Sequence, residues 1–406
     1  MKSHLKLLIV LLITSNSLYG QWQTSFKDSL NYFGCNVFFI NNDTGFVSMG
    51  SYTSAQNGIV FRTLDGGFSW DTVQASNIIY SLDFINDSVG YAAGQDAIVY
   101  KTNNMGLNWN YLSGGGPGND DIFCIHFLDK DSGFYASSSI QKTIDGGNSW
   151  QFITSVLGTA DYPGRSRIQF IDSLTGFVAQ STITKTVDGG NNWFNLNIPS
   201  NFEAISGYFS DLLHGTIVGD NGKVSITSDG GITWSIPDSL GPYPLYDVKF
   251  VSDSIGYIIG GRDRRHYPFN SNGVIFKTIN RGNSWQMMDS SYYDALLKFH
   301  FPSDSIGYAV GFNGLIIKIG NANSLFTSVS NLALPVESIT IKPNPATSRV
   351  TITVNHPSPV IILNSYGSVI LKGFVEIGST EFDLTPFPSG LYLITTGKIT
   401  QKFVKQ

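Results

Sequence analysis

An eight-residue segment recurs along the chain and restricts its fold more than any other feature. Each copy, which we call a box, begins with Thr, carries Asp or Asn at its third position and Gly at its fifth, and ends with Trp. The copies span residues 63–70, 102–109, 143–150, 186–193, 227–234 and 278–285, and their first residues are 39 to 51 residues apart. A period near 40 residues, with short β-type runs between the copies, predicts a β-propeller in which each repeat forms one four-stranded blade.

A second repeated feature places a Phe six residues before a Gly. The pairs, whose Phe we call the core Phe, are Phe39/Gly45, Phe84/Gly90, Phe127/Gly133, Phe170/Gly176, Phe209/Gly215, Phe250/Gly256 and Phe301/Gly307. Seven such pairs stand against six boxes, because the last repeat loses its box after a third strand at 316–319. Trp22 precedes Gly45 by about the distance that separates each box Trp from the next such Gly. We therefore predict that the segment after residue 20 supplies the outer strand of the seventh blade and covers its open edge.

The residue types of the box indicate a structural role. Asp or Asn at the third position can accept a hydrogen bond from the backbone N–H two residues on, and the fifth-position Gly suits a backbone with positive φ. The Trp is expected to start the outer strand and to bury a large area against its neighbour. Because repeat units chiefly stack on their neighbours, we expect the boxes to build the fold and not a binding site.

Composition agrees with a turn-dense all-β protein. Charged residues make up 14% of the chain, aromatic residues 13%, and 43 residues are Gly. The net charge of −5 gives no reason to expect a nucleic-acid partner, which usually binds a basic face.

The N-terminus has the features of a signal peptide. Two lysines are followed by an apolar run at 7–13 and by small residues up to Gly20, which predicts a signal peptide over residues 1–20. No other segment has the length and hydropathy of a transmembrane helix.

The residues just before each core Phe alternate between apolar and polar types, which predicts an inner strand whose polar side faces a central channel. One residue before the core Phe stand Phe38, Asp83, His126, Gln169, Tyr208, Lys249 and His300, and three before it stand Asn36, Ser81, Cys124, Arg167, Ser206, Asp247 and Lys298. Cys124 belongs to this set, whereas Cys35 has the opposite parity in a non-adjacent blade. We therefore expect two free or buried thiols.

Residues 21–320 resemble the Asp-box (BNR-type) propellers, and the paired Phe and Gly signature is similar to the photosystem II assembly/stability factor-like propellers. The resemblance implies a seven-bladed β-propeller, closed here by the N-terminal strand. Members with the same boxes include sialidases and some xyloglucanases, so the boxes indicate a fold more than an activity. Two boxes depart from the pattern, since Asn104 and Asn280 replace the Asp while Met105 and Arg281 replace the first Gly. An Asn can still make the turn.

The repeat rhythm ends at Gly320, and residues 321–336 have the composition of a linker. Residues 337–406 carry short β-type runs separated by turns, which predicts a small β-sandwich. The tail resembles the type A sorting domain of the type IX secretion system, and the residues that carry the resemblance are Lys342, Pro343, Asn344, Pro345, Gly390, Tyr392, Lys402 and Lys405. This implies export by the type IX machinery to the medium or to the outer face of the outer membrane. An ordinary adhesive β-sandwich is the alternative.

No catalytic motif is present in the sequence. Glycoside hydrolysis needs two carboxyl groups, and the better candidates among the Asp residues not committed to the repeats are Asp83, Asp96, Asp120, Asp121, Asp161, Asp220, Asp247 and Asp263. They form no recognisable pair. The run 129–133 resembles the start of a calcium loop but lacks the later ligands, so we predict neither a metal nor a cofactor.

Irregular insertions rich in Arg and Tyr are predicted on the face opposite the boxes. The candidate ligand-binding residues are Tyr162, Arg165, Arg167, Tyr246, Arg262, Arg264, Arg265, Tyr267 and Tyr293. Arg offers a planar set of donors and Tyr a rigid amphipathic face, so this composition favours recognition of a protein, peptide or acidic glycan. The leading hypothesis is a monomeric secreted or surface binding module. The alternatives are a glycoside hydrolase with an Asp pair at the channel mouth and a rigid spacer in a surface layer.

Overall fold

A computed structural model gives the fold of the chain. It describes residues 22–26, 32–51, 58–114, 120–156, 166–236, 238–262, 273–289, 294–320, 322, 339–354, 358–364, 369–375, 378–395 and 400–406. The predicted signal peptide lies outside these residues, and so does the predicted linker except for residue 322. The chain divides into two compact units near residue 327, each of which is described by itself.

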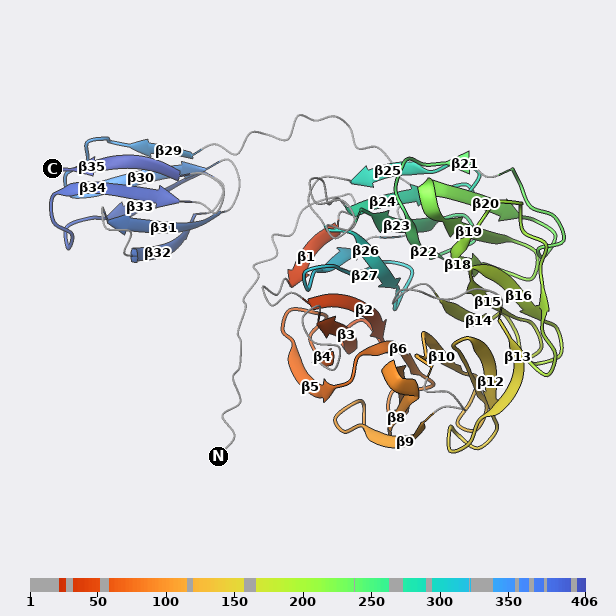
Figure 1. Cartoon of the computed structure of the whole chain (residues 1–406). Coiled ribbons are helices and arrows are strands. Elements are labelled where there is room, and N and C mark those ends of the chain that lie inside the picture. Colours follow the sequence, from red (N-terminus) through yellow and green to blue (C-terminus); the bar gives the residue numbers. More distant parts are fainter. Residues whose placement is uncertain are drawn as a thin grey trace. The chain divides into compact units, whose positions relative to one another are not determined.

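The described part of the first unit forms seven four-stranded antiparallel sheets (Figure 1). The inner strands are β2 (Tyr32–Phe39), β6 (Ile79–Phe84), β10 (Cys124–Phe127), β14 (Arg167–Phe170), β18 (Ala204–Phe209), β22 (Leu245–Phe250) and β26 (Leu296–His300). The second strands are β3 (Gly45–Ser51), β7 (Gly90–Gly94), β11 (Gly133–Ala136), β15 (Gly176–Gln180), β19 (Gly215–Gly219), β23 (Gly256–Gly261) and β27 (Ile306–Gly311). The third strands are β4 (Gly58–Thr63), β8 (Ile98–Thr102), β12 (Ser139–Thr143), β16 (Thr182–Thr186), β20 (Lys223–Thr227), β24 (Gly273–Thr278) and β28 (Ile316–Gly320). The outer strands are β5 (Asp71–Ser76), β9 (Asn110–Gly114), β13 (Gln151–Ser155), β17 (Phe194–Asn195), β21 (Asp238–Ser239), β25 (Gln286–Asp289) and β1 (Trp22–Phe26), and two 3₁₀ turns, η1 (Gln95–Ala97) and η2 (Asp220–Gly222), follow β7 and β19.

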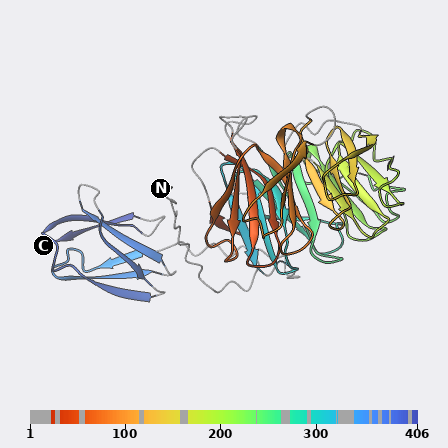
Figure 2. The same ribbon diagram turned by 90° about the horizontal axis from the view of Figure 1, so that it is seen from below.

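The seven sheets stand in a ring with their inner strands toward its centre. Consecutive inner strands contact one another from β2 to β26, and β26 in turn contacts β2 (Figure 1). Seen from the side, the strands run from one face of the ring to the other (Figure 2). Since successive strands alternate in direction, the turn from inner to second strand and the box emerge on the same face, which we call the box face. The connections from second to third strand and from one sheet to the next emerge on the opposite face, the loop face.

The first described strand is the outer strand of the last sheet, at the place predicted for Trp22. β1 pairs antiparallel with β28, and Trp22 lies opposite Ile319. The seam between the last and first sheets is packed like the others, because Tyr308 of β27 stacks on Phe39 of β2 with ring centroids 3.6 Å apart. Equivalent pairs at two further seams are Tyr91 with Phe127 at 3.4 Å and Phe177 with Phe209 at 3.6 Å.

Each box is held by its own side chains, in a pattern that differs in one point from the prediction. In the third sheet, Thr143 Oγ1 accepts from Gly147 N–H at 3.0 Å and donates to Asp145 Oδ1 at 2.8 Å. The Asp145 carboxylate accepts from Ser149 N–H at 2.9 Å, four residues on and not two. The fifth-position Gly has positive φ as expected, with Gly147 at 89°. Trp150 precedes the outer strand and packs edge-on against Phe127 at 6.0 Å.

The box also docks on the inner turn of its own sheet. Gly146 N–H donates to Asp131 O at 2.8 Å, and Arg281 N–H donates to Ser254 O at 3.1 Å in the sixth sheet. Ala322 N–H donates to Ser305 O at 2.9 Å, so the seventh sheet keeps this bond although its box sequence is lost. Met105 and Arg281, which replace the first Gly of their boxes, adopt the same left-handed backbone as that Gly, with Arg281 at φ 60°.

The second unit contains two sheets. Strands β29 (Ile339–Lys342), β30 (Arg349–Val354) and β33 (Gly378–Asp383) form the first, and β32 (Val369–Val375), β31 (Ser358–Asn364), β34 (Gly390–Thr395) and β35 (Thr400–Lys405) form the second. One buried cluster takes side chains from both sheets, among them Ile341, Ile352, Ile362 and Phe403. Within the described ranges, no helix has the length and the apolar character needed to span a membrane.

The residues that carry the sorting resemblance come together in this unit. Asn344 Nδ2 donates to Lys402 O at 3.1 Å, and Val404 N–H donates to Asn344 Oδ1 at 3.0 Å. The 342–345 segment therefore lies against β35, although the two are about sixty residues apart in sequence. Gly390 pairs with Lys405 across β34 and β35, and the Tyr392 hydroxyl donates to Pro388 O at 2.6 Å.

Candidate binding site in the central channel

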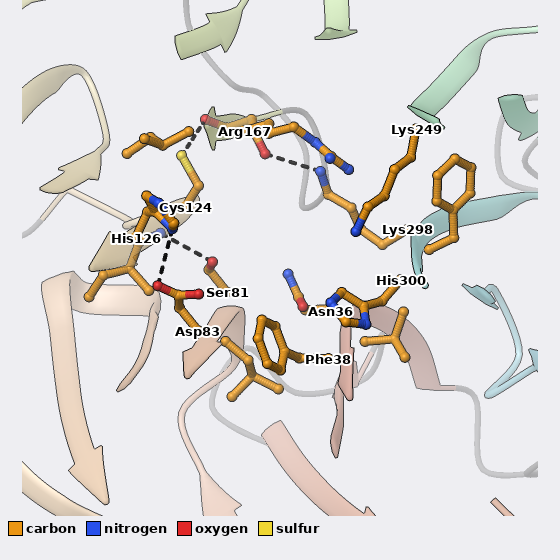
Figure 3. A pocket seen from close by; sticks show the side chains of 16 residues that line it. Asn36, Phe38, Ser81, Asp83, Cys124, His126, Arg167, Lys249, Lys298 and His300 are labelled. Atoms are coloured by element: carbon orange, nitrogen blue, oxygen red, sulfur yellow. Dashed lines mark hydrogen bonds and ion pairs between the residues drawn. The ribbon is translucent and has the colours of Figure 1, made fainter. Parts of the chain in front are cut away.

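A cavity of about 140 Å³ lies at the centre of the ring (Figure 3). Ten of its lining residues come from inner strands at one or three positions before a core Phe, the set predicted to face the channel: Asn36, Phe38, Ser81, Asp83, Cys124, His126, Arg167, Lys249, Lys298 and His300. Ser166, which precedes β14, and residues two positions before a core Phe, such as Phe299, complete the lining. The prediction is confirmed for the ten, because the strand alternation continues up to the core Phe.

Asp247 organises one side of the channel. Arg167 Nη2 donates to both of its carboxylate oxygens, at 2.8 and 2.9 Å, and Ser206 Oγ donates at 2.9 Å. Lys298 Nζ lies 3.9 Å from the same carboxylate and donates to Ser166 O at 3.1 Å. One buried anion therefore faces two cations contributed by other sheets.

The environment of Asp247 keeps it ionised. Burial alone would raise the pKa of this carboxyl, but the charges of Arg167 and Lys298 and the hydrogen bonds from Ser206 and Phe299 N–H lower it below the usual range. A lowered folded-state pKa gives stability that is present above the unfolded pKa and is lost as pH falls through the folded value. Asp247 is thus an anchor for cations and is unsuited to act as a general acid.

Two cationic groups in the channel keep donors that no described residue uses. The hydrogen bonds of Arg167 to the described part of the chain all come from Nη2, which leaves Nη1 and Nε. Lys249 points into the cavity and makes no hydrogen bond or ion pair with any described residue (Figure 3). Burial and the charge of Arg167 lower the pKa of Lys249 to about 7, while Asp247 opposes the shift. The channel therefore offers a partly buried site for an anion.

Other channel side chains accept hydrogen bonds from backbone N–H groups of the neighbouring inner strand. An inner strand has no further strand beside it, so its inward N–H groups need side-chain acceptors. Asp83 Oδ2 accepts from Phe127 N–H at 2.7 Å, and Gln169 Oε1 accepts from Phe209 N–H at 3.0 Å. His300 Nδ1 accepts from Phe39 N–H at 3.3 Å, again in the next sheet of the ring.

The two channel histidines have opposite electrostatic settings. Burial lowers the pKa of His300 well below its usual range, and the charges of Lys249 and Arg167 lower it further. His126 lies 3.2 Å from Asp83 Oδ2. Burial alone would lower the pKa of His126, but the charge and hydrogen bond of Asp83 raise it above its usual value. His300 is therefore neutral at pH 7, whereas His126 gains proton affinity.

An apolar layer lies at the loop-face end of the channel. It is made largely by residues four positions before a core Phe, namely Cys35, Tyr80, Ile205, Tyr246 and Leu297, which are 0 to 7% exposed. The strand register shifts at each of them, so each is the extra residue of a β-bulge. Phe33 contacts both halves of the layer. Side chains from five inner strands therefore form an apolar layer between the polar lining of the channel and the loop face.

The channel consequently opens on the box face. Residues three positions before a core Phe are mostly buried, such as Lys298, whereas those one position before it, such as Lys249 and His300, are only half-buried. A second hollow of about 620 Å³ adjoins on this face, lined by the inner turns of the third and fourth sheets, and it shares His126 with the channel. Exposed Ile144 and Leu174 lie on the same two sheets.

Most of the binding residues predicted on the loop face lie outside the described part of the chain, and the others have varied positions. Tyr162, Arg165, Arg264, Arg265, Tyr267 and Tyr293 lie outside the described residues. Arg167 is part of the channel network. Arg262 donates to Pro242 O at 3.4 Å and lies 5.6 Å from the centre of the Tyr243 ring. Tyr246 is corrected: it is 7% exposed in the apolar layer and does not lie on a loop, because the bulge turns it inward.

Most of the described carboxylates considered for hydrolysis make structural contacts. Asp83 and Asp247 have the partners given above, Asp96 Oδ2 accepts from Asn77 Nδ2 at 3.3 Å, and Asp121 Oδ1 accepts from Asp96 N–H at 3.0 Å. Asp120 accepts a short hydrogen bond from Ser138. Asp220 belongs to the turn η2, and Asp161 and Asp263 lie outside the described residues. Nothing in these contacts favours the hydrolase alternative.

The calcium-like run makes an ordinary turn. Asp129 Oδ1 accepts from Asp131 N–H at 2.8 Å and from Ser132 N–H at 2.7 Å, the same pattern that Asn86 makes in the second sheet. Within the described part of the chain no group of three His, Cys, Asp or Glu residues is placed to hold a metal ion. Cys35 and Cys124 are both free and buried, as expected, and Cys124 Sγ lies 2.9 Å from Ser166 Oγ.

Comparison with known proteins bears on both units. No curated protein matches the chain. Among solved structures, one described as "YCF48 bound to D1 peptide" superposes with a TM-score of 0.60 at 17% identity, over 75% of this chain and 96% of that chain. YCF48 from Cyanidioschyzon merolae gives a TM-score of 0.58 at 15% identity, over 75% and 99%. The WD40 β-propeller domain of Doa1 gives 0.56 at 11% identity, over 76% and 100%. At these identities the likeness shows the fold alone, an all-β, propeller-like architecture.

The tail has a family match of its own. Residues 340–406 match the protein-family model described as "Secretion system C-terminal sorting domain". This confirms that the tail is a C-terminal sorting domain, as its sequence predicted, and leaves its type A assignment a prediction. The chain carries a C-terminal sorting domain, is handled by the type IX secretion machinery, and is secreted or attached to the cell surface.

Proposed function

We propose that the chain is a secreted or cell-surface binding protein that holds an anionic group of a protein, peptide or glycan in its central channel. The observation that carries the proposal is the pair of unused donors on Arg167 and Lys249, which point into a polar cavity. A guanidinium and an ammonium with free N–H groups recognise carboxylate or phosphate. Their partial burial strengthens that attraction relative to open water.

The shape of the site supports entry from the box face. The apolar layer separates the channel from the loop face, and the half-buried residues lie toward the box face. The adjoining hollow between the third and fourth sheets offers room for the part of the ligand that follows the anionic group. One of the solved propeller-like structures is described as bound to a peptide, which supports a peptide as one candidate class.

The proposed function also implies a domain organisation for the whole chain. We propose that the seven sheets are the blades of one closed propeller of Asp-box type over residues 21–320, similar to photosystem II assembly factor-like proteins in its repeat signature. Residues 1–20 would be removed as a signal peptide, 321–336 would act as a linker, and 337–406 would form a β-sandwich. We further propose that the mature protein is a monomer on the extracellular face of the outer membrane or in the medium.

The test is a binding screen of the purified chain without residues 1–20 against peptide and glycan arrays. Arg167→Met and Lys249→Met should each reduce capture of the anionic hits at least about tenfold, as expected for loss of a charge-assisted hydrogen bond. Lys130→Met is the matched control, because Lys130 is an exposed box-face lysine whose side chain is 78% accessible. Capture that survives both channel variants would overturn the channel as the site.

A second arm tests the loop face. Arg262, Arg264 and Arg265 are changed together to Ala, since the Arg and Tyr insertions remain the competing recognition surface. If this variant loses capture while the channel variants keep it, the ligand binds the loop face.

A further inference from the structure

Lys249 stands apart from the other channel cations in its contacts. Lys298 donates to Ser166 O at 3.1 Å and lies 3.9 Å from Asp247, so its ammonium is engaged. Lys249 has no such partner among the described residues, and Figure 3 shows it reaching into the cavity. An ammonium that is partly buried without a counter-ion is driven toward its neutral form.

The groups that face Lys249 reinforce this effect. Arg167 and Lys298 are like charges, and His300 is neutral because its Nδ1 accepts from Phe39 N–H. The anion on that side, Asp247, is already bound by Arg167 and Ser206. The remaining titratable pair, Asp83 with His126, makes its own contact at 3.2 Å. A pKa of about 7 for Lys249 agrees with this arrangement.

We propose that Lys249 is a nucleophilic amine that forms an imine with a small aldehyde or α-oxo acid whose carboxylate lies against Arg167. The neutral amine attacks the carbonyl carbon to give a carbinolamine, which loses water to leave the C=N bond. No oxidant or reductant is needed. This inference rests on the proposed use of the channel as an anion site and adds a carbonyl group to the ligand class.

The size of the cavity limits the ligand. An engineered protein cavity of about 150 Å³ holds benzene, and the channel cavity has about 140 Å³. Glyoxylate is smaller than benzene and carries both an aldehyde and a carboxylate. Arg167 Nη1 and Nε are the donors left for that carboxylate within the described residues.

The experiment treats the native chain with glyoxylate and cyanoborohydride, which reduces an imine to a carboxymethyl amine, and maps the adducts by mass spectrometry. At pH 7 about half of an amine with a pKa near 7 is neutral, against roughly one in 2,500 for an ordinary lysine. We expect Lys249 to be modified at least about tenfold faster than exposed Lys130, with a rate that rises through pH 7. Buried Lys298 is the matched control and should stay unmodified because its ammonium is engaged.

Glycolate separates this inference from the proposed function, since it has the carboxylate but no carbonyl. Glycolate should bind the chain and protect Lys249, and Lys249→Met should abolish the rapid adduct while circular dichroism stays unchanged. Glycolate binding without rapid Lys249 labelling would overturn the inference and leave the anion site standing. Rapid labelling that glycolate does not prevent would overturn the proposed ligand class, and absence of both would overturn the inference and the anion site together.

Discussion

Removing the anion from the Arg167, Asp247 and Lys298 network should destabilise the ring far more than removing the guanidinium. Asp247→Asn leaves two cations, with side chains only 16% and 8% exposed, facing each other without a counter-charge. Breaking a buried ion pair in this way costs about 3–5 kcal/mol. Arg167→Met leaves the carboxylate with the Ser206 hydroxyl, the Phe299 N–H and Lys298. Its expected cost is therefore nearer to about 1–2 kcal/mol.

Urea unfolding followed by Trp fluorescence measures both variants. All seven Trp residues lie between residues 22 and 285, so the signal reports the ring and not the tail. The double variant should cost less than the sum of the single ones, by about 1–3 kcal/mol, because the two side chains are in contact. The reasoning is refuted if Arg167→Met costs as much as Asp247→Asn, or if the two effects simply add.

The loss of stability caused by Asp247→Asn should depend on pH. Because the folded-state pKa of Asp247 is lowered, its ionised form contributes stability above the unfolded pKa of about 3.9. That contribution disappears as pH falls through the folded value. The difference between the wild-type chain and Asp247→Asn should therefore be full at pH 6 and shrink in acid, and a difference that grows in acid would contradict the assignment.

Three further predictions concern single contacts. Asp83→Asn should lower the pKa of His126 in an NMR titration, and with it the stability that His126 contributes below its unfolded pKa and loses as pH rises through the folded value. Thr143→Val should lower the free energy of unfolding by about 1–2 kcal/mol, because the valine can neither accept from the box N–H nor donate to the box carboxylate. Arg281→Gly should change the melting temperature little or raise it, since φ is 60° there, whereas Gly146→Ala should lower it because a Cβ would lie 2.8 Å from a backbone oxygen.

Most of the ring could be predicted from the sequence because each repeat carries its own local chemistry. The Thr, the acidic residue and the Gly of a box contact one another within a few residues, so their spacing alone specifies the turn. The N-terminal strand could be placed for the same reason, from the spacing of Trp22. The tail followed from motifs at both of its ends, which the structure brings together at Asn344 and Lys402.

The bulge in the inner strands was not predicted, and Tyr246, which occupies one, was assigned to the insertions of the loop face. Counting alternate residues back from a core Phe assumes a regular strand, and an extra residue reverses every side chain beyond it. A signal was present, because adjacent apolar residues stand five and four positions before the core Phe, as in Ala204-Ile205, Leu245-Tyr246 and Leu296-Leu297. Adjacent side chains of a regular strand point to opposite faces, so two neighbouring apolar residues indicate an irregular strand where both are buried.

The sequence predicted which side chains face the channel but not which of them have hydrogen-bond or ion-pair partners within the chain. The partners of Asp247 come from sheets 41 to 80 residues away, and Lys298 meets Ser166 over 132 residues. Such contacts depend on the closure of the ring and leave no local pattern. The unused donors on Lys249 could be found only after every other channel group had been assigned a partner.

The chemistry of the side chains explains why those two residues remain for a ligand. Asp83, Gln169 and His300 can accept the N–H of the next inner strand, and they do so. Lys and Arg have donors only, so Lys249 cannot perform this structural task at the same position, and neither can Arg167 three positions before its core Phe, where Ser81 accepts from Ile125 N–H in another sheet. A donor placed where the ring needs acceptors adds nothing to closure and costs desolvation unless an anion meets it. Arg167 finds part of its anion in Asp247, Lys249 finds none among the described residues, and the missing partner is therefore best sought outside the chain.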